Sequence, residues 1–128
     1  MISGIDPGAN PATEAAWGVT HPMTPFGGGF EFYYDGWMAS GAGVPGSSGH
    51  IMRISQNGIG GTGRIDGVLS PTQAATIDRK LDDGQPNAGY VIADYGSTGT
   101  TDCKISAQQR YREELQDGIC LLYIRTFR

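Results

Sequence analysis

The feature that most constrains this chain is a short helix signal with a marked beginning, in "LSPTQAATIDRKLDDGQPNAGYV", residues 69–91. Ser70 is typical of a helix N-cap, and Pro71 suits the first helical position. Gln73 completes a capping box with Ser70, in which each side chain accepts from a backbone N–H group of the other residue. The pattern predicts a helix over residues 70–83, capped by Ser70.

A turn signal marks the far end of this helix. Gly84 suits the left-handed residue that ends a helix, and Pro86 blocks its continuation. Asp82 and Asp83 stand just before, where acids oppose the helix dipole. We expect them to pair with Arg79 at i+3 and i+4, and to accept backbone N–H bonds from the "GQPNAG" turn. These residues therefore define a structural helix-and-turn unit.

The apolar stripe of the helix is narrow. Ala74, Ile77 and Leu81 fall at i, i+3 and i+7, on one face. Burial of three small side chains does not position a short helix by itself, so its ends must be fixed by capping. We expect the stripe to lie on a face or at the edge of a sheet.

Alternating and apolar runs predict the strands of that sheet. Asp35-Gly36 is a hairpin-turn signature, which places a first strand before it and a return strand after it. The stretch 40–49, "SGAGVPGSSG", is predicted to be a loop. Hairpins and a single short crossover favour an antiparallel sheet in an α+β fold with Gly-rich loops, and one domain over residues 1–128. The predicted strands are residues 30–34, 37–39, 50–55, 89–96 and 118–127.

Composition narrows the possible partners. The chain has 128 residues, 21 of them Gly, and 38% are hydrophobic, which suits one modest core rather than a disordered chain. The net charge of −4 comes with no basic cluster, which argues against nucleic acid as a partner. The longest apolar run, residues 119–124, is far shorter than the roughly 20 residues that a membrane helix needs.

Two stretches of the sequence match the letters of functional motifs but lack the surroundings that those motifs need. "GIGGTG" at residues 58–63 fits G-x-G-x-x-G, but nucleotide binding needs these glycines to lead directly into a helix, and the helix begins at Pro71. "GSSGH" places two serines beside His50, with no acid positioned to orient the histidine. We expect a flexible hairpin or loop at the first motif and no nucleophile at the second.

Acidic residues offer one further possibility. Asp82 and Asp83 could form a carboxylate pair, and Asp94 and Asp102 flank a loop that could bind calcium. Oxygen-rich loops are usually just solvated, and Asp82 and Asp83 have the structural role described above. The sequence therefore predicts no catalytic residues, no cofactor, no metal, no small-molecule substrate and no enzyme.

The two cysteines, Cys103 and Cys120, fit no zinc-site spacing. Between them lies a polar segment with little core-forming surface, and Cys120 begins an apolar strand. A small Gly-rich chain with two nearby cysteines favours a disulfide and an exported protein. The alternative is a pair of unpaired thiols in a cytosolic protein.

The helix-and-turn segment resembles one found in prepilin-like proteins of Gram-negative bacteria, the relatives of type IV pilins and type II secretion pseudopilins. Their pattern is close to L-(S/T)-P-x-Q-A-x-x-I-D-x-K-(I/L)-D-D-G-x-P-x-x-G-x-V. The tail, from Cys103 through Tyr111 and Gly118 to "CLLY", is similar to the closing disulfide loop and final strand of that group. "PFGGGFEFYYD" resembles, more loosely, the entry into the first pilin strand. The matching positions are Leu69, Pro71, Gln73, Ala74, Ile77, Asp78, Lys80, Leu81, Asp82, Asp83, Gly84, Pro86, Gly89 and Val91.

The resemblance implies a pilin-like globular domain, part of a structural subunit of a type IV pilus or a type II secretion-like filament. Its partners would be other pilin subunits, and its location an extracellular filament or the periplasm, with a precursor anchored in the inner membrane. The family's leader peptide and long apolar helix do not appear in this sequence. We expect that this helix was removed or is supplied by another chain, and that the sheet face that would cover it is partly exposed.

A second function class fits the aromatic residues. In a carbohydrate- or surface-binding module, such as a phage or adhesin domain, exposed Trp17, Trp37 and the tyrosines of "FEFYYDGW" would stack on sugars. An aromatic stripe at strand spacing is more often core, so this function is the alternative to the filament subunit.

Overall fold

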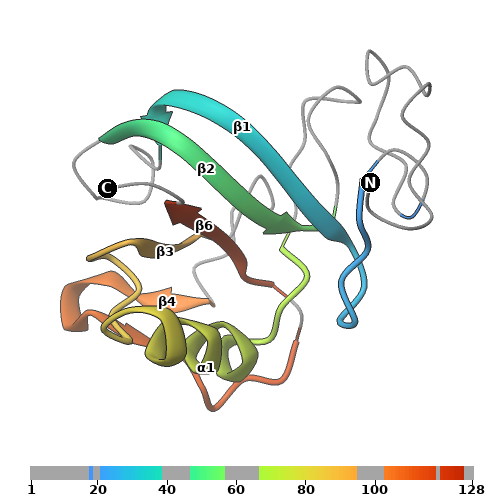
Figure 1. The fold of residues 1–128 in the computed structure, drawn as a ribbon. Coiled ribbons are helices and arrows are strands. Elements are labelled where there is room, and N and C mark those ends of the chain that lie inside the picture. The colour runs from blue at the N-terminus through green and yellow to red at the C-terminus, as the bar shows by residue number, and fades with distance from the viewer. Residues whose placement is uncertain are drawn as a thin grey trace.

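The computed structural model describes residues 18, 21–38, 47–56, 67–94, 103–117 and 119–125. They form an α+β fold with a four-stranded antiparallel sheet in the order β1-β2-β6-β3 and a two-stranded sheet, β4-β5 (Figure 1). The elements are β1 (Gly29–Met38), β2 (Ser47–Ser55), α1 (Pro71–Leu81), β3 (Val91–Asp94), β4 (Lys104–Ile105), the 3-10 helix η2 (Ser106–Gln108), β5 (Arg110–Tyr111) and β6 (Leu121–Arg125). The predicted α+β class is confirmed at this level.

The core lies between one face of the four-stranded sheet and a layer made of α1 and the β4-β5 pair (Figure 1). Leu122 and Cys120 lie on this face, as the alternation of the last strand predicts. Alternate residues of a strand point to opposite faces, which is why Leu121 and Tyr123 lie on the other side. The buried members of this core are Ile54, Leu69, Ala74, Ala75, Val91, Ala93, Cys103, Tyr111, Cys120, Leu122 and Ile124.

The helix differs from its prediction at one end and along one side. It ends at Leu81, with Asp82 as the C-cap, rather than at residue 83. Ala74 is buried as expected, but Ile77 is only partly buried and Leu81 is 58% exposed. At about 100° per residue, the buried arc is centred toward Ala75 and Asp78, so the predicted stripe lies along its margin.

The β1-β2 hairpin is longer than the sequence predicted. Asp35-Gly36 is not the turn, because β1 continues to Met38 and β2 already begins at Ser47. Asp35 pairs with Gly49 and Met38 with Ser47, so two residues of β1 stand opposite one of β2. Asp35-Gly36 therefore lies at a β-bulge within a continuing strand, and not at a turn. The predicted loop 40–49 accordingly loses its last three residues to β2.

The other face of the sheet is also buried. The strand register places Glu31, Arg53, Tyr123 and Ile92 in one row across β1, β2, β6 and β3. Each of the four is at most 9% exposed, and Arg53 forms a buried ion pair with Glu31. Such a pair fixes the register of β1 on β2, because a one-residue slip would leave two unpaired buried charges.

The sheet face that we expected to be partly exposed is buried on β3 and β6, but Met52 on β2 is only partly buried and its neighbour Phe32 on β1 is exposed. Among the described residues, four large apolar side chains are exposed. Phe32 on β1 is 62% exposed, and Met23 and Phe26 in the preceding turn are 60% and 44% exposed. Leu81 at the helix end is the fourth.

Candidate functional site

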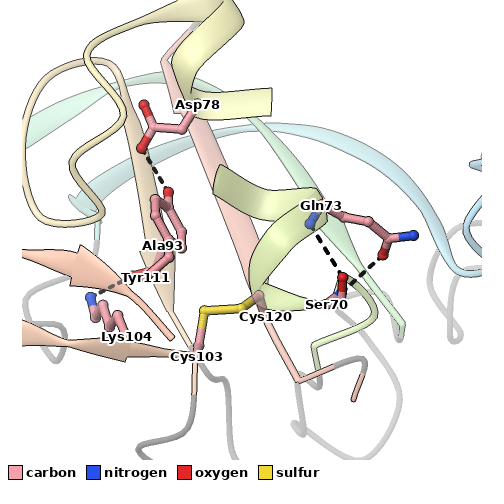
Figure 2. The surroundings of a disulfide bond; sticks show 8 residues. All are labelled: Ser70, Gln73, Asp78, Ala93, Cys103, Lys104, Tyr111 and Cys120. Atoms are coloured by element: carbon pink, nitrogen blue, oxygen red, sulfur yellow. Dashed lines mark hydrogen bonds between the residues drawn. A yellow bond between two sulfur atoms is a disulfide. The ribbon is translucent and has the colours of Figure 1, made fainter. Parts of the chain in front are cut away.

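The N-terminus of α1 is held by the predicted capping box. The Gln73 N–H group donates to the Ser70 hydroxyl oxygen over 3.2 Å, and the Ser70 N–H group donates to the Gln73 side-chain oxygen over 2.9 Å (Figure 2). Just before the cap, Leu69 exchanges two backbone hydrogen bonds with Cys120. The start of the helix is thus fixed to the chain that leads into β6.

The C-terminus of α1 is held by carboxylates that accept backbone N–H bonds; the predicted donors in the turn 84–89 are found for Asp83, whereas the donors to Asp82 lie just beyond that turn. Asp83 accepts from the Gln85 N–H group over 2.8 Å. Asp82 accepts from Tyr90 and, over 3.1 Å, from Val91, so it reaches past the turn to the first residue of β3. These bonds connect the end of the helix to the start of the strand.

The backbone of this turn needs glycine at two positions. Gly84 and Gly89 both have positive φ, 76° and 73°. A Cβ atom on Gly89 would also collide with the Asp82 carboxylate. Gly84 is left-handed as predicted, although it follows the helix end by three residues because the helix stops at Leu81. Pro86 is buried, and its carbonyl accepts from the Ala93 N–H group over 2.9 Å.

The middle of α1 carries a buried acid, Asp78, which points toward β5 (Figure 2). The Tyr111 hydroxyl donates to one of its carboxylate oxygens over 2.7 Å, and the Gly84 N–H group donates to the other over 3.0 Å. Burial raises the pKa of Asp78 to about 6, although both hydrogen bonds act to lower it. Burial, followed by the bond to Asp78, also raises the pKa of Tyr111, so its hydroxyl stays protonated and keeps donating.

Residues 104–117, which we call the flap, are closed on the core by a disulfide. Cys103 and Cys120 form the predicted bond, with a Cα–Cα distance of 5.2 Å, and both are fully buried (Figure 2). The buried Lys104 follows directly, and its ammonium donates to the Ala93 carbonyl on β3. Burial lowers the pKa of Lys104 to about 8, against the opposing effect of Asp94. The flap is therefore joined to the residue before β6 by the adjacent disulfide, and to β3 by the buried cation of Lys104.

The outer side of the flap contacts α1 through exposed groups. Arg79 forms a two-bond ion pair with Glu113 rather than with Asp82 or Asp83, which corrects the sequence prediction. The carboxylates of Asp82 and Asp83 are instead taken up by backbone N–H groups, which leaves Glu113 as the partner. The Thr72 hydroxyl also donates to the Glu113 carbonyl over 3.2 Å.

Three carboxylates converge at the end of the helix, where oxygens of Asp78, Asp82 and Asp83 lie within 4.8 Å of one another. Acids at this spacing are candidate ligands for a hard cation. The hydrogen bonds above occupy both oxygens of Asp78 and one oxygen each of Asp82 and Asp83 with N–H and O–H donors. These hydrogen bonds give the three carboxylates a structural role, because they connect the end of α1 to the following turn, to β3 and to Tyr111 on β5.

Sequence reasoning missed the buried polar residues of this region. Asp78 matched the family pattern but had no assigned role, and Tyr111 and Lys104 were placed in a polar connection. The sequence signal that could have indicated a buried residue here is Tyr111, a lone aromatic residue within the charged run "RYREEL". "GIGGTG", Asp102 and Trp17 lie outside the described residues, as does the side chain of Trp37.

No protein-family model, curated protein or solved structure matches this chain. Among the helices of the described residues, none is long and apolar enough to cross a membrane.

Proposed function

We propose that this chain is the globular domain of a prepilin-type filament subunit, of the type IV pilus or type II secretion kind. The observation that carries the proposal is the segment 69–91, which resembles that family. Several of the residues that match the family pattern have a definite structural role in this segment. Gln73 completes the cap, Asp82 binds the start of β3, and Gly89 leaves room for Asp82.

The disulfide supports an exported location for this subunit. Disulfides persist in oxidising compartments, such as the periplasm and the cell exterior, and are rare in the cytosol. In this proposal the domain acts through contacts with other subunits and performs no chemistry. Its partners are further pilin subunits, in a homopolymer or a minor-pilin complex, joined through a long apolar helix.

The test is fractionation of cells that carry the gene. Filaments are sheared from the surface, collected by ultracentrifugation and probed with an antibody against this domain, with a periplasmic marker as the control. We expect the domain in the filament pellet or in cross-linked complexes with other prepilins in the envelope. A domain found only in the cytosolic fraction, with both thiols free to alkylation, would contradict the proposal.

A second candidate function is a carbohydrate- or surface-binding module. The supporting observation is the exposure of two aromatic rings, Phe26 and Phe32. A glycan array with the wild-type domain tests it, with Phe32→Ser as the variant and Leu81→Ser, which removes another exposed apolar side chain, as the matched control. Binding that Phe32→Ser abolishes and Leu81→Ser retains would favour this second function.

A further inference from the structure

The flap is attached to the rest of the molecule by side chains. In the described part of the chain, the backbone-to-backbone hydrogen bonds of its residues join them to one another or to the flanking residues Cys103 and Ile119. Its contacts with the rest of the molecule include the Tyr111–Asp78 bond and the Lys104–Ala93 bond, beside the disulfide that precedes it (Figure 2). Glu113 adds its contacts with α1. An element attached in this way can open without breaking the main sheet.

Two of these attachments bury an ionisable group. Asp78 is fully buried and Lys104 is 4% exposed, and each is held by hydrogen bonds to neutral groups, Asp78 by Tyr111 and Gly84 and Lys104 by the Ala93 carbonyl. Asp82 and Asp83, at the end of the same helix, add negative charge near Asp78, while Tyr111 and Gly84 donate to it. Asp94 on β3 is the charged group that acts on Lys104. Opening the flap would return both groups to water.

We propose that the flap is a pH-sensitive latch. It stays closed in acid and opens more readily at neutral pH, and the Cys103–Cys120 disulfide limits how far it opens.

The direction follows from the proton balance. In the closed form the pKa of Asp78 is about 6, and in water it returns toward 3.8, so closing takes up a proton. The stability that Asp78 gives to the closed form is therefore lost progressively as the pH rises from about 3.8 to about 6. For Lys104 the pKa is about 8 when closed and 10.5 in water, so closing releases a proton and gains stability as the pH rises above 8. Opening is easiest between pH 6 and 8.

The disulfide itself reports opening, because both of its cysteines are fully buried and a reductant reaches them only when the flap moves. The experiment measures the initial rate of reduction by a phosphine, divided by the rate for the urea-unfolded protein at the same pH. We expect this ratio to rise from about pH 4.5 to about pH 7 by roughly twentyfold, since each pKa unit is a factor of ten and part of the interval between 3.8 and about 6 lies below pH 4.5. A ratio that stays constant over this range would overturn the proposal.

Two variants test whether the Asp78 carboxyl causes the pH dependence of the reduction rate. Asp78→Asn does not ionise and retains one oxygen, which can accept from Tyr111 or from Gly84, so we expect its ratio to be independent of pH below 7. Asp83→Asn, in the same cluster but exposed, is the matched control and should keep the wild-type slope. If Asp78→Asn keeps the slope, or Asp83→Asn loses it, the latch is not governed by Asp78 and the proposal fails.

Low urea concentrations separate local opening from global unfolding. A latch that opens locally exposes little surface, so we expect the reduction rate to depend weakly on urea. Tyr111→Phe, which loses one attachment, should raise the ratio at every pH while the sheet keeps its urea midpoint for β-sheet circular dichroism within a small shift. A reduction rate with the full urea dependence of global unfolding would contradict the latch.

Discussion

The four-stranded sheet and the flap are held in place by different kinds of bond. The sheet strands exchange backbone hydrogen bonds over three antiparallel pairings, and both sheet faces are buried on β6. The flap has two short strands paired with each other, and it contacts the sheet and α1 through side chains and one disulfide. Backbone ladders tolerate most substitutions, whereas an element held by side chains depends on a few residues. Substitutions should therefore affect the flap selectively, with one exception in the sheet.

That exception is the ion pair between Arg53 and Glu31, and it carries the largest expected effect. Arg53→Met leaves the Glu31 carboxylate buried without its cation, which should cost about 3–5 kcal/mol of unfolding free energy. Urea unfolding measures the loss. The double variant Arg53→Met/Glu31→Leu should be less destabilised than the single variant, and equal losses in both would show that the charge pair is not the cause.

The disulfide is the next largest contribution, and it belongs to the flap. Its cysteines are 17 residues apart in the sequence, a separation at which the chain-entropy estimate is about 3 kcal/mol. Cys103→Ser/Cys120→Ser should lower the urea midpoint accordingly, and amide exchange in residues 104–117 should increase more than exchange in β2. Uniform acceleration over both regions would contradict the separate attachment of the flap.

The helix cap gives a smaller effect, between the two regions. Ser70→Ala removes the acceptor for the Gln73 N–H group and should cost about 1 kcal/mol. Ser70→Asp keeps an acceptor at the same position and serves as the control, with a midpoint close to wild type. An unchanged midpoint for Ser70→Ala would mean that the neighbouring backbone bonds between Leu69 and Cys120 hold the helix start without the cap.

The exposed ion pair on the outer side of the flap should matter least. The side chains of Arg79 and Glu113 are 55% and 37% exposed, so Glu113→Gln should cost less than about 1 kcal/mol, and less still at high salt. Thermal unfolding at low and high ionic strength measures it. A loss as large as that of the disulfide variant would place the main attachment of the flap on its outer side.

The sequence alone determined the elements whose signals are local. The cap of α1 by Ser70 and Gln73 depends on residues three apart, and the left-handed Gly84 depends on its own backbone. The partner of Cys103 could be predicted because the chain has one other cysteine. Alternation in residues 50–55 and 118–127 also predicted β2 and β6, since the period of two is a property of each strand by itself.

The tertiary structure decided what depends on residues far apart. Asp35-Gly36 has the letters of a turn, but pairing with β2 extends β1 through it as a bulge. Asp78 can be buried because Tyr111, 33 residues away, donates to it, and Arg79 is paired with Glu113, 34 residues away. No local pattern encodes these partners. A strand that continues through a turn signal and an acid that is buried in the core both cost free energy. The contacts that offset this cost exist only once the chain has folded.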